Sequence, residues 1–98
     1  MIRHIALFRF KDHITADDID MLDTSLRALP DTIDVIGSYT CGRDLGLIEG
    51  SWDYAVVADF DSPEDYHAYV GHPEHVHVAA NIAKPMMAQS TRVQLALD

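Results

Sequence analysis

Apolar and polar side chains alternate along three stretches of the chain. Residues 2–10, 52–60 and 91–97 each place successive side chains on opposite faces. A period of two residues is typical of β-strands. Residues 35–41 are also rich in strand-forming side chains, and we expect Gly37 at a bulge there. The pattern therefore predicts four strands. Because both faces of the first strand carry large apolar groups, we expect both faces of the sheet to be covered.

Between these strands, apolar side chains recur every three or four residues, as they do on one face of a helix. In the first such stretch they follow Thr15, a typical N-cap residue, and stop at Pro30. The second stretch opens with Ser62 and Pro63, a hydroxyl N-cap followed by a proline at the first helical position. We expect this helix to run to about Val70, with Gly71 following it in the positive-φ conformation that glycine can take at a C′ position.

A further helix is predicted from Pro73 onward. Its inward face carries side chains at helical spacing, namely His75, Val78, Ala79, Ile82 and Met86. His75 is the polar member of this face, so its imidazole is predicted to point inward. We expect Pro85 to interrupt or kink the helix near Lys84.

The predicted order is β-α-β-β-α-β, which is that of the ferredoxin-like α+β fold, a four-stranded antiparallel sheet with helices on one face. We expect residues 1–98 to form one domain. The helices leave the other face of the sheet uncovered, and we place the following apolar residues on it: Ile5, Leu7, Ala55, Val57 and Ala96. A second copy of the sheet would cover this face, which predicts a two-fold symmetric homodimer.

Charge and composition exclude several kinds of partner. Sixteen acidic and seven basic residues give a net charge of −9. This balance argues against nucleic acid and against anionic membrane surfaces, both of which attract Lys and Arg. Cys41 is the single cysteine, so no intrachain disulfide is expected. We find no signal peptide and no membrane span in the sequence, and we expect a cytoplasmic protein.

Tyr69 and His75 are the residues whose chemistry suits catalysis. An inward imidazole beside an inward phenol can act as a general acid–base pair. The alternative is that His75 is a core histidine bonded to the backbone or to a neighbour. A metal site built from the histidines at 67, 72, 75 and 77 is disfavoured, because His75 and His77 diverge by about 200° on a helix. We therefore expect neither a metal nor an organic cofactor.

Three stretches resemble the stress-responsive dimeric α+β barrel (Dabb) family. They are residues 2–11, the stretch Phe60-x-Ser62-x-Glu64, and the motif Tyr69-x-x-His72-Pro73-x-His75. The similarity extends over essentially the whole chain. It implies a homodimer in which two four-stranded sheets close into a barrel. One plant member of the family is a polyketide cyclase that needs no cofactor.

The resemblance also implies roles for single residues. Tyr69 and His75 stand at the catalytic positions of the cyclase, and His4 matches a histidine that borders its pocket. Leu26 and Tyr54 stand where the cyclase has a pocket tyrosine and a pocket histidine. Together with the inward faces, this predicts a substrate pocket lined by His4, Ala6, Phe8, Leu22, Leu26, Tyr54, Val56, Val78, Ile82 and Met86.

Three functions remain open from the sequence. The first is a small cofactor-free enzyme of cyclase, isomerase or lyase type, acting on a small apolar, aromatic or polyketide-like ligand. The second is a non-catalytic small-molecule-binding or stress-response protein, and the third is a cofactor-free aromatic monooxygenase. An open pocket floored by Phe8, Val56 and Ile82 favours chemistry, whereas a closed core around His75 favours a structural role.

Overall fold

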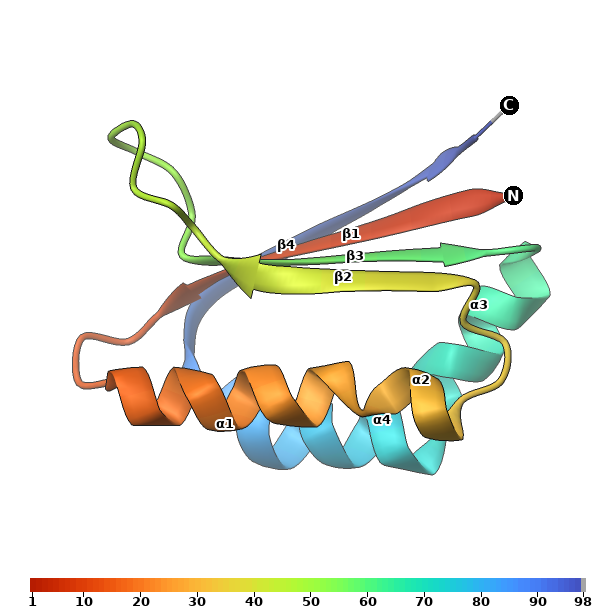
Figure 1. Cartoon of the computed structure of the whole chain (residues 1–98), viewed down its shortest axis with the longest axis horizontal. Helices are drawn as coiled ribbons and strands as arrows, with labels where there is room; N and C mark the ends of the chain where they lie inside the picture. The colour runs from red at the N-terminus through yellow and green to blue at the C-terminus, as the bar shows by residue number, and fades with distance from the viewer. Residues whose placement is uncertain (98) are drawn as a thin grey trace.

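The structure, a computed structural model that describes residues 1–97, has a four-stranded sheet with the helices on one of its faces (Figure 1). The strands are β1 (Ile2–Phe10), β2 (Ser38–Arg43), β3 (Tyr54–Phe60) and β4 (Met87–Ala96). They are antiparallel and lie in the order β2-β3-β1-β4. The helical segments are α1 (Ala16–Arg27), α2 (Leu29–Thr32), α3 (Pro63–Gly71), α4 (Pro73–Val78), η1 (Ala79–Ala83) and α5 (Lys84–Met86). The predicted ferredoxin-like α+β fold is confirmed.

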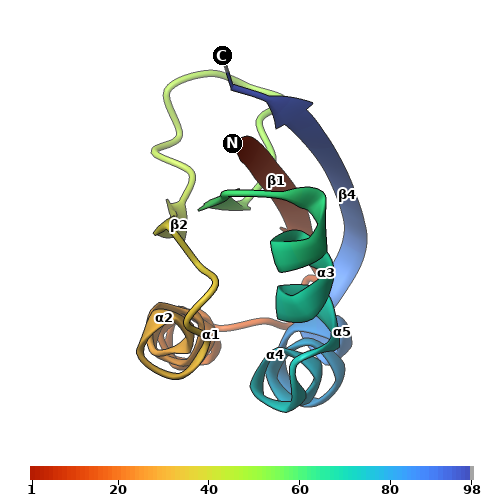
Figure 2. The ribbon, with the colours of Figure 1, turned by 90° about the vertical axis from the view of Figure 1, so that its right-hand side faces the viewer.

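The helices form two groups beside each other under the sheet, α1 with α2 and α3 with α4 and α5 (Figure 2). Thr15 caps α1 with a reciprocal capping box, in which the Thr15 hydroxyl accepts from the Asp18 amide and the Asp18 carboxylate accepts from the Thr15 amide. The Ser62 hydroxyl caps α3 by accepting a single hydrogen bond from the amide of Asp65 at 3.2 Å. These caps hold the helix starts where the sequence predicts them.

The break between α3 and α4 differs in one detail from the expectation. Gly71 is the last residue of α3 and does not have a positive φ. The chain instead turns at His72, whose backbone is extended at φ −65° and ψ 136°. The Nδ1 atom of His72 accepts a hydrogen bond from the Glu74 amide at 3.1 Å, so an imidazole caps α4 and Pro73 occupies its first turn.

A π-helical turn, η1, follows α4. The amide of Lys84 bonds to the carbonyl of Ala79, five residues earlier. Pro85 comes directly afterwards, and a proline cannot donate to the carbonyl four residues before it. The wider π turn brings the chain to Pro85 at a point where no amide of residue 85 is needed. The interruption predicted near Lys84 is therefore a π-helical turn.

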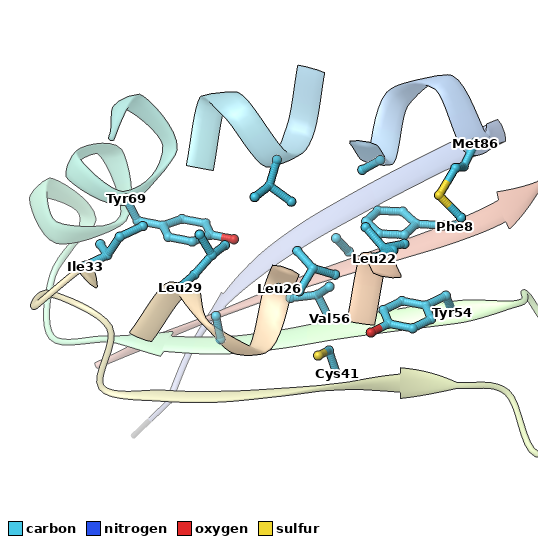
Figure 3. Close-up of a cluster of buried hydrophobic side chains, with 14 of the residues drawn as sticks. Phe8, Leu22, Leu26, Leu29, Ile33, Cys41, Tyr54, Val56, Tyr69 and Met86 are labelled. Carbon is cyan, nitrogen blue, oxygen red and sulfur yellow. The ribbon is translucent and has the colours of Figure 1, made fainter. Parts of the chain in front are cut away.

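The core lies between the sheet and the two helix groups (Figure 3). Leu22 and Leu26 of α1 are buried with Val56 and Phe8 of the sheet, which confirms the apolar face predicted for the helix between Thr15 and Pro30. Tyr54 is 1% exposed and its ring stacks on Phe8 with a centroid distance of 6.0 Å. The hydroxyl of Tyr54 donates to Asp23, which joins α1 to β3 at the edge of this core.

The opposite face of the sheet carries apolar side chains that no helix of residues 1–97 covers. Cross-strand pairing places Val57 and Val93 on either side of Ile5, and Val93 is 51% exposed. Ala96 pairs with Ile2 and therefore shares the helix-facing side, so its predicted place on the uncovered face is wrong. Leu95, which pairs with Arg3, lies on the uncovered face instead.

Strand boundaries differ from the predicted ones by a few residues. Strand β2 begins at Ser38 because Gly37 belongs to the preceding turn, not to a bulge. The amide of Gly37 donates to the carbonyl of Asp59 at 2.8 Å, and a Cβ on Gly37 would lie 3.1 Å from that oxygen. Glycine therefore permits this close approach. Strand β4 starts earlier than predicted, at Met87.

No helix among residues 1–97 is long and apolar enough to cross a membrane.

Candidate functional site

A cavity of about 110 Å³ lies between the sheet and the helices α1, α3 and α4. Its lining is mostly apolar and aromatic, and comprises His4, Ala6, Phe8, Leu26, Tyr39, Val56, Tyr66, Tyr69, Val70, His75, Val78, Ala79, Ala83, Met87 and Arg92. Val70 is 37% exposed and Arg92 is exposed, whereas most other lining residues are buried. The cavity therefore reaches the surface between α3 and β4.

Eight residues of the predicted site line this cavity: His4, Ala6, Phe8, Leu26, Val56, Tyr69, His75 and Val78. Cross-strand pairing brings three of them together, because Ala6 pairs with Val56 and the neighbouring His4 lies on the same face of β1. The proline-initiated α4 then presents His75 and Val78 to this face of the sheet.

Four predicted pocket residues do not line the cavity. Leu22, Tyr54 and Met86 are buried in the core beside it, and the Tyr54 hydroxyl donates to the Asp23 carboxylate of α1. Ile82 lies instead in a groove beside Leu29. Ile82 packs against the core as predicted, but η1 is a π turn, and Ala83 reaches the cavity with Ala79 in its place.

His75 is half-buried, and its Nδ1 atom lies 3.0 Å from the carbonyl oxygen of Val70. A carbonyl only accepts hydrogen bonds, so Nδ1 carries the proton and Nε2 of the neutral ring has a free lone pair. Burial lowers the pKa of His75 below its ordinary value, and the nearby cation of Arg92 and the ring of His72 lower it further, against the hydrogen bond to Val70. At neutral pH the ring is thus an uncharged base.

Tyr69 packs against His75 with a ring-centroid distance of 4.3 Å. Its side chain is 2% exposed, and its hydroxyl lies 3.1 Å from the hydroxyl of Tyr39. Burial raises the pKa of Tyr69 above its ordinary value, so the phenol stays protonated at neutral pH. The site therefore pairs a neutral imidazole with a neutral phenol.

His4 is the second imidazole of the cavity and is 6% exposed. The side-chain amide nitrogen of Gln94 donates to its Nδ1 at 2.9 Å, which leaves the ring proton on Nε2. Burial, followed by the charges of Arg92 and His75, lowers the pKa of His4 to about 4. His4 is therefore a neutral hydrogen-bond donor, whereas His75 is an acceptor.

Seven lining residues are absent from the predicted pocket, although Ala79 was placed on the inward helix face: Tyr39, Tyr66, Val70, Ala79, Ala83, Met87 and Arg92. The sequence holds a signal for Tyr66 but not for Arg92. Tyr66 precedes Tyr69 by three residues and shares its helix face. Arg92 shares a strand face with Gln94, but only the pairing of β4 with β1 shows that this face is turned toward His4.

The lining combines one base, several neutral donors and one cation within apolar walls. Such a site can remove a proton from carbon and stabilise the oxyanion that develops beside it. Within the part of the chain that the structure describes, no three His, Cys, Asp or Glu side chains converge as metal ligands would.

Comparison with known proteins gives a consistent result. A family model described as "Stress responsive A/B Barrel Domain" (Dabb) matches residues 2–95. The chain is 25% identical to the stress-response A/B barrel domain-containing protein HS1 of Arabidopsis thaliana over 80 residues, which are 80% of this chain and 73% of that protein.

Two solved structures extend this comparison. A dimeric ferredoxin-like protein of unknown function from Thermobifida fusca YX is 46% identical, with a TM-score of 0.91 over 98% of this chain and 90% of that chain. Hydroxynitrile lyase from Passiflora edulis is 19% identical and has a TM-score of 0.87, covering 99% of this chain and 93% of that chain. At that lower identity the likeness concerns the fold alone.

Proposed function

The chain belongs to the Dabb family of stress-responsive A/B barrel domains, and we propose that it is a homodimeric, cofactor-free enzyme of cyclase, isomerase or lyase type. In this proposal a small apolar carbonyl compound occupies the cavity beside His75. Nε2 of His75 takes a proton from the carbon next to the carbonyl, and the electron pair of the broken C–H bond forms an enolate. The enolate then recovers a proton at another position or attacks a second carbonyl, as isomerases and cyclases require.

The observation that carries this proposal is the hydrogen bond from His75 Nδ1 to the Val70 carbonyl. It holds the ring in the tautomer whose Nε2 is unprotonated. Because burial also lowers the pKa of His75, the free base predominates at neutral pH. The second imidazole of the cavity, His4, has the opposite tautomer and is not a candidate for the base.

Two neutral donors would stabilise the enolate oxygen. Tyr69 offers its hydroxyl, and His4 offers Nε2–H. Both side chains are buried among apolar groups, where a hydrogen bond to a developing negative charge is stronger than in water. Neither donor carries a charge that binding of the substrate's carbonyl group would have to compensate.

The proposed homodimer rests on the uncovered face of the sheet. Ile5, Leu7, Val57, Val93 and Leu95 gather there. Sheets with an apolar face pack against another sheet about 10 Å away. The Thermobifida fusca protein, which is 46% identical, is described as dimeric and supports this arrangement.

A fold neighbour supports enzymatic chemistry by analogy only. The Passiflora edulis protein is a hydroxynitrile lyase, which shows that this fold is compatible with a lyase active site. Function resides in the site and not in the fold, so this likeness does not identify the reaction of the present chain.

A non-catalytic small-molecule-binding protein is the second candidate. One observation favours it, since the Tyr69 hydroxyl already has a partner in Tyr39 and His75 Nδ1 already has one in Val70. Side chains whose polar atoms bond to other protein atoms in this way can also have a purely structural role in the core. In this case the cavity would hold a ligand without transforming it.

Deuterium incorporation into phenylacetone separates the two functions. This aromatic ketone carries exchangeable protons next to its carbonyl, and their replacement in D₂O is followed by NMR. We expect the wild-type protein to accelerate exchange, His75→Gln to abolish the acceleration, and His13→Gln to retain it, because His13 lies in the exposed turn after β1. Equal acceleration by wild type and His75→Gln would exclude His75 as the base. Binding of phenylacetone without accelerated exchange would favour the binding protein.

A further inference from the structure

We infer that the ligand of the cavity is a small carboxylate with an apolar body, whose anionic group binds Arg92 at the cavity mouth. This inference rests on the proposed use of the cavity as a ligand site, and it adds the chemical class of the ligand. Arg92 was not among the residues that the sequence pattern singled out, and its position follows from the pairing of β4 with β1.

Arg92 pairs with Ala6 in the central strand β1, so its side chain lies on the helix-facing side of the sheet. It lines the cavity although it is exposed to solvent. Strand β4 is the edge strand on the same side of the molecule as α3 and α5 (Figure 2). The guanidinium thus stands where the cavity opens, and the apolar groups lie behind it.

Arg92 is the arginine without a partner among residues 1–97. Arg3, Arg27 and Arg43 form ion pairs with aspartates, and Arg9 lies over the ring of Trp52 at 4.6 Å. The chain carries sixteen acidic residues, yet none of those within residues 1–97 lines the cavity. In a protein of net charge −9, a cavity with one cation and no carboxylate is suited to an anionic group.

The geometry of a guanidinium favours a carboxylate in particular. Its planar set of donors matches the two oxygens of a carboxylate, and such charge-assisted bonds are stronger than neutral ones. The negative charges elsewhere on the protein repel an approaching anion only weakly, because physiological salt screens interactions over distances beyond about 8 Å. A contact with Arg92 is much shorter than that distance.

The cavity limits the size of the apolar body. At about 110 Å³ it is somewhat smaller than the engineered apolar cavity of roughly 150 Å³ that holds benzene. Phe8, Leu26 and Val56 supply apolar walls. The apolar body is therefore no larger than a single ring or a short branched chain, with its acid group at the mouth.

A carboxylate on Arg92 would also act on the proposed base. The cation of Arg92 lowers the pKa of His75, and of His4 as well. An anion beside the guanidinium offsets this effect, so binding would strengthen His75 as a base at the moment when the substrate is present. The groups that face His75 are Tyr69 on α3, His72 at the cap of α4, His4 on β1 and Arg92 on β4, and Lys84 of α5 lines a surface groove with it.

Benzoate and benzamide, which have the same ring and differ in charge, test the inference by calorimetric titration. We expect wild-type protein to bind benzoate more tightly than benzamide. Arg92→Gln should weaken benzoate binding about tenfold, the effect of losing a hydrogen bond to a charged group, and leave benzamide binding unchanged. Arg92→Lys, which keeps the charge but loses the planar fork, should weaken benzoate binding less than Arg92→Gln does.

Lys11→Gln is the matched control, because it removes one exposed cation that does not line the cavity. It should leave binding of both probes unchanged. Inorganic phosphate, an anion without an apolar body, should not displace benzoate.

Each other outcome has a definite meaning. Equal benzoate affinity in wild type and Arg92→Gln, with both probes bound, would overturn the carboxylate assignment and leave the proposed ligand site intact. Displacement of benzoate by phosphate would overturn it too, since the site would then bind anions in general. Failure of both probes to bind wild-type protein would contradict the ligand site itself, and this inference with it.

Discussion

The Nδ1 atom of His75 lies 3.0 Å from the carbonyl oxygen of Val70, across the break between α3 and α4. Val70 is in the last turn of α3, where backbone carbonyls have no partner within the helix. His75 therefore completes the end of one helix from the first turn of the next. The same bond fixes its tautomer, so the structural role of the ring and its proposed role as a base depend on a single contact.

The first prediction concerns the pH dependence of proton transfer by His75. Only the neutral ring accepts a proton, so the rate of phenylacetone exchange should rise with pH through the pKa of His75 and then level off. Because burial lowers this pKa from its ordinary value of 6.5, the inflection should fall below pH 6.5 and the plateau should include neutral pH. Exchange rates measured in deuterated buffers of increasing pH check this. An inflection well above pH 6.5 would show that another group is the base.

The second prediction separates the two tyrosines whose hydroxyls lie 3.1 Å apart. Tyr69→Phe removes the proposed oxyanion donor and should lower the exchange rate about a hundredfold. Tyr39→Phe removes only its partner and should leave the rate within a few-fold of the wild-type value. Each change breaks the same hydrogen bond, so each should lower the free energy of unfolding by about 1 kcal/mol.

Tyr39→Phe thus serves as the control for the stability effect of Tyr69→Phe. Urea denaturation gives the stabilities and deuterium exchange gives the rates. A similar rate loss in both variants would mean that the hydroxyl pair, and not Tyr69 alone, supports the reaction.

The third prediction concerns the stability that the protein loses at low pH because His4 is buried in its neutral form. Its pKa is lowered to about 4 in the folded protein, against 6.5 for an ordinary histidine. Between these values the unfolded chain binds a proton that the folded protein does not, so stability should fall as the pH decreases from 6.5 to 4. A shift of this size corresponds to roughly 3 kcal/mol, since each pKa unit is about 1.4 kcal/mol.

His4→Gln should reduce this loss of stability, and His13→Gln, which changes an exposed histidine, should leave it unchanged. Urea denaturation at pH 7 and pH 4.5, at one protein concentration, measures the difference. Carboxylates that titrate in the same range affect all three proteins equally, so the comparison isolates His4. Identical pH slopes for wild type and His4→Gln would contradict the prediction.

The helices and strands were predictable because their signals are local. Thr15, Ser62 and Pro73 mark helix starts through side-chain hydrogen bonds and ring geometry within one turn. The helix-facing side of β1 was predictable for a similar reason, because strand alternation depends only on sequence spacing. Three residues of the cavity wall, His4, Ala6 and Phe8, followed directly from it.

The rest depended on contacts between distant parts of the chain. Ile82 was placed in the cavity by α-helical spacing, and the π turn before Pro85 changed that spacing. Arg92 and Ala96 could be assigned to a face only through the register of β4 against β1, which pairing sets and local sequence does not. The cation of the site was therefore the part that sequence reasoning could not find.

The last prediction concerns the homodimer. Val93 of β4 and Val76 of α4 are exposed to a similar extent, at 51% and 49%, but they lie on opposite sides of the molecule. Val93 is beside Ile5 on the uncovered sheet face, where the partner sheet is proposed to pack. Val93→Asp would bury an unpaired carboxylate in that interface, which costs several kcal/mol, and should dissociate the dimer. Val76→Asp adds the same charge on the helix side and should leave the dimer intact. Sedimentation velocity of both variants and the wild type distinguishes the two faces. A wild-type monomer would contradict the dimer, and a dimer lost through Val76→Asp but kept in Val93→Asp would mean that the copies meet through their helices.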